Sequence, residues 1–210
     1  MSNWQQQVYR RLTPLFALLK EIVKSGPVIQ MDETTVQVIG EEDRCDTQKS
    51  YMWLARGGPP KQKVLWYEYQ KTCAAYHARA FLEGYSGYLQ TDGYEGYDAA
   101  VKDMSGIIHV GCFADARRKF FEAAKVATKP QSAQEGIKHI RKLYQLEDEL
   151  GSKNLDNDVF LIERKTRAKP ILEQFKSWIL KRIDDVLPSS QLGKAMNYTV
   201  AQWDKMTAYL

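Results

Sequence analysis

The sequence predicts an α/β fold, a mixed five-stranded sheet with helices that is followed by an all-helical section, and three observations support this prediction. Between residues 28 and 70, three runs rich in Val, Ile, Trp and Tyr follow one another, separated by turn-forming residues. From residue 73 to residue 127, strand-like and helix-like segments alternate, which is typical of strands added in parallel to one sheet. After Pro130 only helical patterns follow.

The first expected element is an amphipathic helix over residues 3–24. Its apolar side chains recur at intervals of three and four residues, at Trp4, Val8, Leu12, Leu15, Leu19 and Ile22. Pro14 bends or splits this helix, and Gly26-Pro27 ends it. The strands that come next are "VIQMDETTVQVI", "SYMWLA" and "KVLWYEY". Because turns join them directly, we expect antiparallel pairing.

The alternating region begins with a short helix in "CAAYHARAFLEGY". The strand "GYLQTD", the helix "YDAAVKDM", the strand "IIHVGC" and the helix "ADARRKFFEAAKVA" follow. Further helices are expected over residues 133–150, 158–186 and 190–210. The chain thus divides into a helical segment at 1–26, a sheet-containing core at 27–130 and a helical region at 131–210. A ribonuclease-H-like fold has this element order, although other α/β folds can give it too.

Composition restricts the classes of protein to which the chain can belong. Of its 210 residues, 44% are hydrophobic and 27% charged, which suits one or two globular domains. No run approaches the roughly 18 apolar residues of a membrane span, and the N-terminus lacks the apolar segment of a signal peptide. We therefore expect a cytoplasmic protein with no membrane partner. Its three cysteines form no Cys-x-x-Cys pair and are expected to be reduced thiols.

Two aspartates are candidate metal ligands. Asp32 lies within the first strand, and Asp92 ends the fourth, sixty positions later. If these strands are parallel neighbours, as in a ribonuclease-H-like fold, the two carboxylates can meet and offer oxygen ligands to Mg²⁺ or Mn²⁺. Taken singly, an aspartate in such a position is more often a turn or cap residue than a metal ligand. Glu33 points to the opposite face of a regular strand, so it is only an accessory candidate.

Four segments resemble successive blocks of the insertion sequence 66 family of bacterial transposases: "MDETTVQV", "GYSGYLQTDGYEGY", "HVGCFADARRKFFEA" and "LPSSQLGKAMNYTVAQWDKMTAYL". The resemblance runs in order over nearly the whole chain. It implies a DDE transposase with a ribonuclease-H-like core, in which Asp32 and Asp92 match the first and second catalytic aspartates. It also implies two-metal cleavage and transfer of double-stranded DNA, at transposon ends and target, in the bacterial cytoplasm, and it leaves a homo-oligomer open.

The sequence departs from the family pattern at two places. The family's third acidic residue follows the block that resembles "YTVAQWDKMTAYL", and this sequence ends at Leu210 before reaching it. The resemblance therefore implies a central fragment that binds metal weakly and has little or no activity alone. Asp115 occupies a position where the family usually has histidine, which adds a possible accessory carboxylate. Residues 131–210 match the helical insertion of the family.

Basic residues are candidates for DNA contact. Arg117, Arg118 and Lys119 open the helix after the fifth strand, where they can contact phosphate or form an ordinary solvated face. The basic run at 163–169 is more typical of a solvated face. Three functions stay open: a truncated transposase core, a non-catalytic DNA-binding module, and a metal-dependent nuclease of the same fold.

Overall fold

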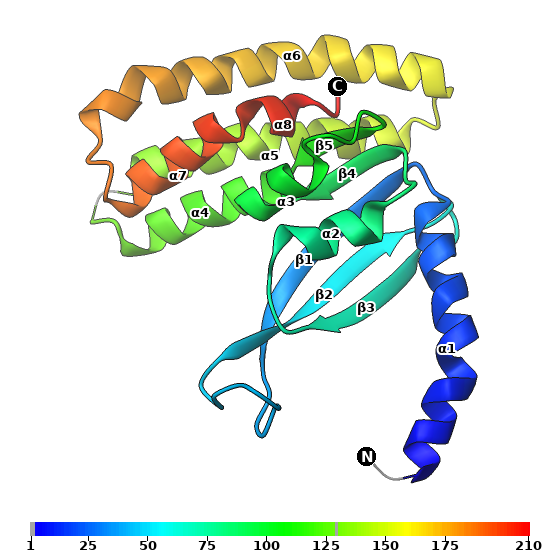
Figure 1. Cartoon of the computed structure of the whole chain (residues 1–210). Coiled ribbons are helices and arrows are strands. Elements are labelled where there is room, and N and C mark those ends of the chain that lie inside the picture. The colour runs from blue at the N-terminus through cyan, green and yellow to red at the C-terminus, as the bar shows by residue number, and fades with distance from the viewer. Residues whose placement is uncertain (1–2, 129) are drawn as a thin grey trace. The chain divides into compact units, whose positions relative to one another are not determined.

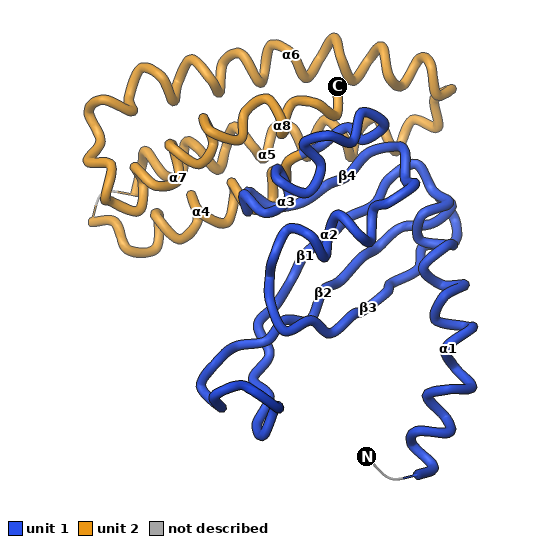
Figure 2. The backbone as a smooth tube through the Cα atoms, viewed as in Figure 1, with its two compact units in different colours: residues 1–110 blue, residues 111–210 orange. Residues whose placement is uncertain are grey.

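The computed structural model describes residues 3–128 and 130–210. It divides into two compact units, unit 1 over Met1–Val110 and unit 2 over Gly111–Leu210, which Figure 2 distinguishes by colour. This division lies ahead of the boundary expected at residue 130, because the helix that follows the fifth strand belongs to the second unit.

Unit 1 contains the sheet (Figure 1). Its elements are α1 (Asn3–Lys24), β1 (Val28–Gln37), β2 (Lys49–Gly57), β3 (Val64–Gln70), α2 (Ala75–Leu82), β4 (Gly87–Thr91), α3 (Glu95–Val101) and β5 (Ile107–Gly111). The strand order is β3-β2-β1-β4-β5. β1 pairs antiparallel with β2 and β2 with β3, whereas β1 and β4 are parallel. This is the mixed ribonuclease-H-like sheet that the sequence predicts.

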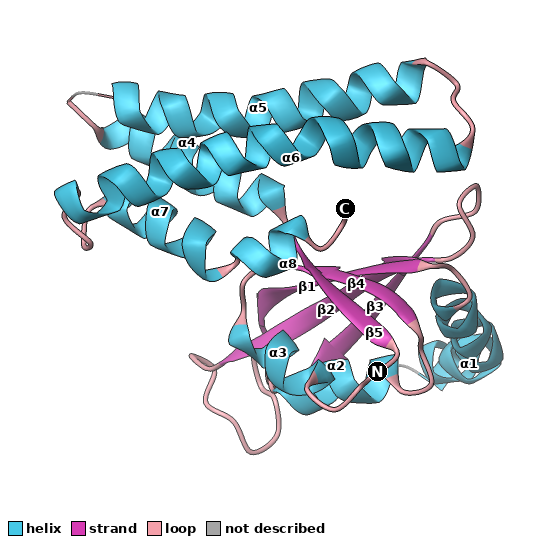
Figure 3. Ribbon diagram, turned by 90° about the horizontal axis from the view of Figure 1, so that it is seen from above, coloured by secondary structure: helices cyan, strands magenta, loops and turns pink. Residues whose placement is uncertain are grey.

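The core of unit 1 lies between one face of the sheet and the helices α2 and α3 (Figure 3). Ile29 and Met31 of β1 are buried there, because alternate residues of a strand point to the same face. Leu89 of β4 and Phe81 of α2 are buried with them. Full burial of each such side chain contributes about 1.5–3 kcal/mol. The same alternation directs Gln30 and Asp32 toward the opposite face.

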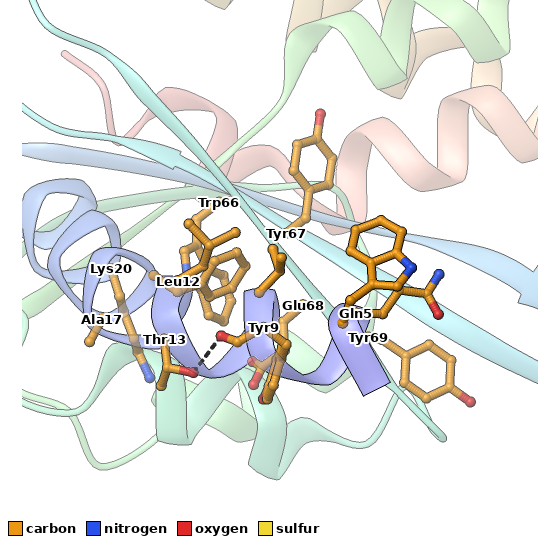
Figure 4. Close-up of a pocket in the computed structure, with 13 residues that line it drawn as sticks. Gln5, Tyr9, Leu12, Thr13, Ala17, Lys20, Trp66, Tyr67, Glu68 and Tyr69 are labelled. Atoms are coloured by element: carbon orange, nitrogen blue, oxygen red, sulfur yellow. Dashed lines mark hydrogen bonds between the residues drawn. The ribbon is translucent and has the colours of Figure 1, made fainter. Parts of the chain in front are cut away.

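α1 is attached to unit 1 through its C-terminal turns. Val23 is fully buried, and the approach is so close that a Cβ atom at Gly57 would lie 2.3 Å from the carbonyl oxygen of Val23. Toward its N-terminus the helix exposes large apolar side chains, among them Trp4 and Tyr9. A groove of about 770 Å³ separates this part of α1 from β3 (Figure 4). The apolar stripe predicted for this helix is therefore only partly covered.

Unit 2 is helical in its described residues. Its helices are α4 (Phe113–Val126), α5 (Gln131–Ser152), α6 (Asn157–Arg182), α7 (Gln191–Ala201) and α8 (Trp203–Thr207), with a 3-10 turn at Ile183–Asp185. α4 packs against α5 and α7, and α5 packs against α6. Phe120, Phe175 and Ile140 lie in the shared core, fully buried. None of the helices in residues 3–128 and 130–210 has both the length and the apolar character that a membrane span requires.

Candidate active site

The candidate site lies where β1 and β4 run side by side. Their parallel register pairs Val28 with Tyr88 and Gln30 with Gln90, and β4 ends at Thr91. If this register continued for two more residues, Asp32 would lie level with Asp92, which directly follows β4. The preceding pair supports the alignment, because the Gln30 side-chain amide donates a hydrogen bond of 2.6 Å to Oε1 of Gln90.

The backbone around each aspartate orients its carboxylate. Oδ1 of Asp32, an exposed residue, accepts a hydrogen bond of 2.9 Å from the backbone N–H of Glu33. Oδ1 of Asp92, a half-buried residue, accepts one of the same length from the N–H of Tyr94, two residues on. Such a bond is typical of an Asx turn, so Asp92 also shapes the connection from β4 to α3. The role of Asp92 in the turn is therefore compatible with its role as a candidate metal ligand.

A series of polar contacts next to Asp92 connects β4, β5 and α3. Oγ1 of Thr91 lies 2.9 Å from the backbone oxygen of Asp92 and 2.8 Å from Nε2 of His109. Nδ1 of His109 in turn faces Oδ1 of Asp98 at 3.1 Å. Because Thr91 is buried and His109 nearly so, these contacts fix the position of the end of β4. No local sequence pattern links His109 to Thr91, so this contact could not be read from the sequence.

Glu33 interacts electrostatically with both aspartates, although strand alternation directs its side chain to the opposite face of the sheet from Asp32. Its Oε2 accepts a hydrogen bond of 2.5 Å from the hydroxyl of Tyr97 on α3. Partial burial raises the pKa of Glu33, and the charges of Asp92 and Asp32 raise it further, while the Tyr97 bond opposes them. Burial likewise raises the pKa of Tyr97, as do the bond to Glu33 and the charges of both aspartates. Asp32 and Asp92 therefore act on the same two groups.

Aromatic rings form the inner wall beside these carboxylates. Tyr97 is fully buried and makes edge-to-face contacts with Trp53 and Tyr94, each at 5.9 Å between ring centroids. The hydroxyl of Tyr94 donates to the backbone oxygen of Cys73 at 2.9 Å. This packing holds α3 against the sheet and fixes the position of the Tyr97 hydroxyl under Glu33.

The donor set matches a hard divalent cation only in part. Carboxylate oxygens on neighbouring strands are the ligands that Mg²⁺ and Mn²⁺ prefer. However, residues 3–128 and 130–210 contain no group of three or more His, Cys, Asp or Glu side chains close enough to hold a metal ion. Asp32 and Asp92 would supply at most two carboxylate ligands, and the remaining ligands would have to come from water, substrate or another segment.

The structure separates the three basic residues at the start of α4. Arg118 pairs with Asp115 in the first turn of the same helix, at 2.9 Å. Lys119 lies over the ring of Tyr198 on α7, 4.6 Å from its centroid. Arg117 is exposed on a third side of the helix and lines a groove with residues of α5. Successive helical residues point about 100° apart, so they form no single patch.

The sheet order and the parallel β1–β4 pair define a ribonuclease-H-like α/β protein with a helical section. Within that class, the sequence model of the family described as "Transposase IS66 family" matches residues 1–210, and the chain belongs to this family. The residue blocks quoted above carried this resemblance, and the family assignment they implied is confirmed.

Curated relatives of this chain come from Sinorhizobium fredii. The uncharacterized protein y4jD is 27% identical over 220 residues, which covers 100% of this chain and 42% of that protein. The uncharacterized protein y4hP is also 27% identical, over 95% of this chain and 39% of that protein. The chain therefore spans about two fifths of the length of these relatives.

Among solved structures, a chain from the cryoEM structure of a simian T-cell lymphotropic virus intasome, in complex with the PP2A regulatory subunit B56 gamma, is similar to this protein. The match covers 69% of this chain and 49% of that chain, with 13% sequence identity and a TM-score of 0.33.

Proposed function

We propose that this chain is part of a transposase catalytic core, in which Asp32 and Asp92 contribute ligands to Mg²⁺ or Mn²⁺ for cleavage and transfer of double-stranded DNA. One observation supports this most directly: Asp32 lies on β1, Asp92 directly follows its parallel neighbour β4, and the charges of both aspartates act on the same two groups, Glu33 and Tyr97. Family membership supplies the reaction class.

The residues of this chain hold and orient the proposed ligands. The N–H groups of Glu33 and Tyr94 fix the carboxylates of Asp32 and Asp92, and the Thr91–His109 contact supports the second of them. When bound, a divalent cation supplies Lewis-acid activation of a water or 3′-hydroxyl and stabilises the leaving oxygen of the phosphodiester. Because two aspartates make an incomplete ligand set, we propose that the third acidic ligand lies outside these residues and that the fragment alone has little or no strand-transfer activity.

Binding of Mn²⁺, measured by electron paramagnetic resonance or calorimetry, tests the proposal without depending on activity. We expect weak binding by the wild-type chain and at least about a tenfold loss of affinity in Asp32→Asn and in Asp92→Asn, since each removes a charged ligand. Glu83→Gln, at an exposed position just after α2, is the matched control and should bind as the wild type does.

This titration, together with assays of DNA binding and DNA cleavage, separates the alternatives. Unchanged Mn²⁺ affinity in both aspartate variants would contradict the proposal. If the variants also kept salt-dependent DNA binding, a non-catalytic DNA-binding module would be the better assignment of function. Metal-dependent DNA cutting without joining, by the chain alone, would instead favour a nuclease.

A further inference from the structure

A groove of about 420 Å³ lies between α4 and α5 of unit 2. Its α4 wall presents Arg117 and Phe121, and its α5 wall presents Gln134, Lys138 and Arg141. On each helix these residues are separated by three or four positions, so they form one stripe along the helix surface. Figure 3 shows the two helices side by side.

The close packing of α4 and α5 fixes the width of this groove. Gly136 on α5 faces Phe120 on α4, and a Cβ atom at Gly136 would lie 2.6 Å from two atoms of the Phe120 ring. Ile137, nearly buried, forms part of the groove lining. The charged side chains therefore stand on two rigid helices rather than on a loop, and their separation is set by the core beneath them.

The groove carries an excess of positive charge. Arg117 and Arg141 are exposed and form no ion pair with any residue that the structure describes. Lys138 has one acidic neighbour, Oε2 of Glu135 at 3.8 Å. Nζ of Lys125 lies over the ring of Phe121, 4.9 Å from its centroid, and so adds a further cation beside the same wall.

We propose that this α4–α5 groove binds the phosphate backbone of DNA. Guanidinium groups bind phosphate oxygens with two parallel hydrogen bonds, and two unpaired arginines on facing helices can contact successive phosphates. The inference rests on the proposed function, since the transposase family supplies DNA as the polyanion. It replaces the expected patch at Arg117, Arg118 and Lys119 by one that combines Arg117 with Lys138 and Arg141.

Fluorescence anisotropy with a short labelled DNA duplex, in EDTA and over a range of KCl concentrations, tests the groove. In the double variant Arg117→Gln/Arg141→Gln we expect at least about a tenfold loss of affinity. The slope of log K against log salt concentration should become shallower by about 2, because each lost phosphate contact contributes about 0.9. Both side chains are exposed, so circular dichroism should show an unchanged fold.

The matched control is Lys165→Gln/Lys169→Gln, which removes the same charge from exposed positions of α6. We expect a small loss and a nearly unchanged salt slope. Equal losses in the two double variants would overturn the groove, because binding would then follow net charge alone. Equal affinity for a polyglutamate peptide of the same charge would overturn DNA as the ligand. Since EDTA removes the metal, this result is independent of the Mn²⁺ titration that tests Asp32 and Asp92.

Discussion

Glu33 depends on a single buried donor, the hydroxyl of Tyr97, while it lies near two other carboxylates. Half-buried acids of this kind are costly to ionise unless a donor or a cation compensates. The bond therefore makes the fold tolerate negative charge at the very place where the proposed site needs it. The bond also connects α3 directly to β1, which is the strand that pairs with β4.

Replacing Tyr97 by phenylalanine removes that donor and keeps the ring. We expect the free energy of unfolding to fall by about 1.5–3 kcal/mol, the usual range for losing a hydrogen bond to a charged group. Urea unfolding followed by circular dichroism measures it. Tyr88→Phe, at a side chain that is 40% exposed, is the control and should change stability by less than about 0.5 kcal/mol. Equal effects in the two variants would show that the Glu33 bond is unimportant.

Strand alternation and element order were sufficient to predict that Asp32 lies on the first strand and Asp92 at the end of the fourth, on parallel neighbours; their role as metal ligands stays a prediction. The bond from Tyr97 to Glu33 could not be predicted in the same way. It joins residues 64 positions apart, and its existence depends on how α3 packs on the sheet. The chain from Thr91 through His109 to Asp98 is of the same kind, since its three members lie on three elements.

At the scale of elements, ion pairs fasten α5 to α6. Both guanidinium nitrogens of the Arg167 fork donate to the two carboxylate oxygens of Glu149, at 2.9 and 2.6 Å, and Arg164 bonds to Glu147 at 2.7 Å. The basic run at 163–169 looked like a solvated face in the sequence. Two of its arginines instead pair across helices, which no pattern within α6 could indicate.

These pairs make the stability of unit 2 dependent on acid. Hydrogen bonds from Arg167 and Lys153 lower the pKa of Glu149 to about 2, from an ordinary value of 4.5. A carboxyl with a lowered pKa stabilises the fold above the unfolded value and loses that contribution as pH falls toward the folded one. We expect thermal stability to decline between about pH 4.5 and 2, and Glu149→Gln to make this decline shallower.

Thermal melts across that pH range measure the effect. Glu173→Gln, at an exposed position of α6, is the control and should keep the wild-type dependence. His139 makes a separate contribution to the pH dependence of stability, at higher pH than Glu149. Burial lowers its pKa below 6.5, so the fold favours its neutral form. A decline of the same steepness in Glu149→Gln and the wild type would contradict the role given to the Arg167 pair.

Gly136 sets the distance between α4 and α5. In Gly136→Ala the new methyl group would meet the Phe120 ring at 2.6 Å, so the helices must separate or the ring must turn. We expect a loss of about 1–3 kcal/mol, as for other overpacked cores. Gly151→Ala in the same helix has no atom within 4 Å of its added Cβ and should gain about 0.5–1 kcal/mol. A loss in Gly151→Ala as large as in Gly136→Ala would refute the steric explanation.

At the scale of the whole chain, the order and type of the elements were predictable. Strand periodicity located all five strands of unit 1, and the helical patterns located α4 to α7. The helix expected over residues 190–210 is instead interrupted at Gln202, which separates α7 from α8. α4 reads in the sequence as the last helix of the sheet region, yet Phe120 and Ala116 bury themselves among residues of unit 2. Which core a helix joins depends on its distant partners.

The parallel seam between β1 and β4 has a consequence for folding. β1 pairs with β2 from Gln30 to Gln37, but its register with β4 extends only from Val28 to Gln30. The antiparallel strands are joined by short connections and can assemble early, whereas β4 must return across a long stretch of chain. The pairing of β1 with β4, beside which Asp32 and Asp92 lie, is therefore expected to form late and open first. A cation held by both carboxylates would bind only while β1 and β4 are paired, and it would therefore stabilise that pairing.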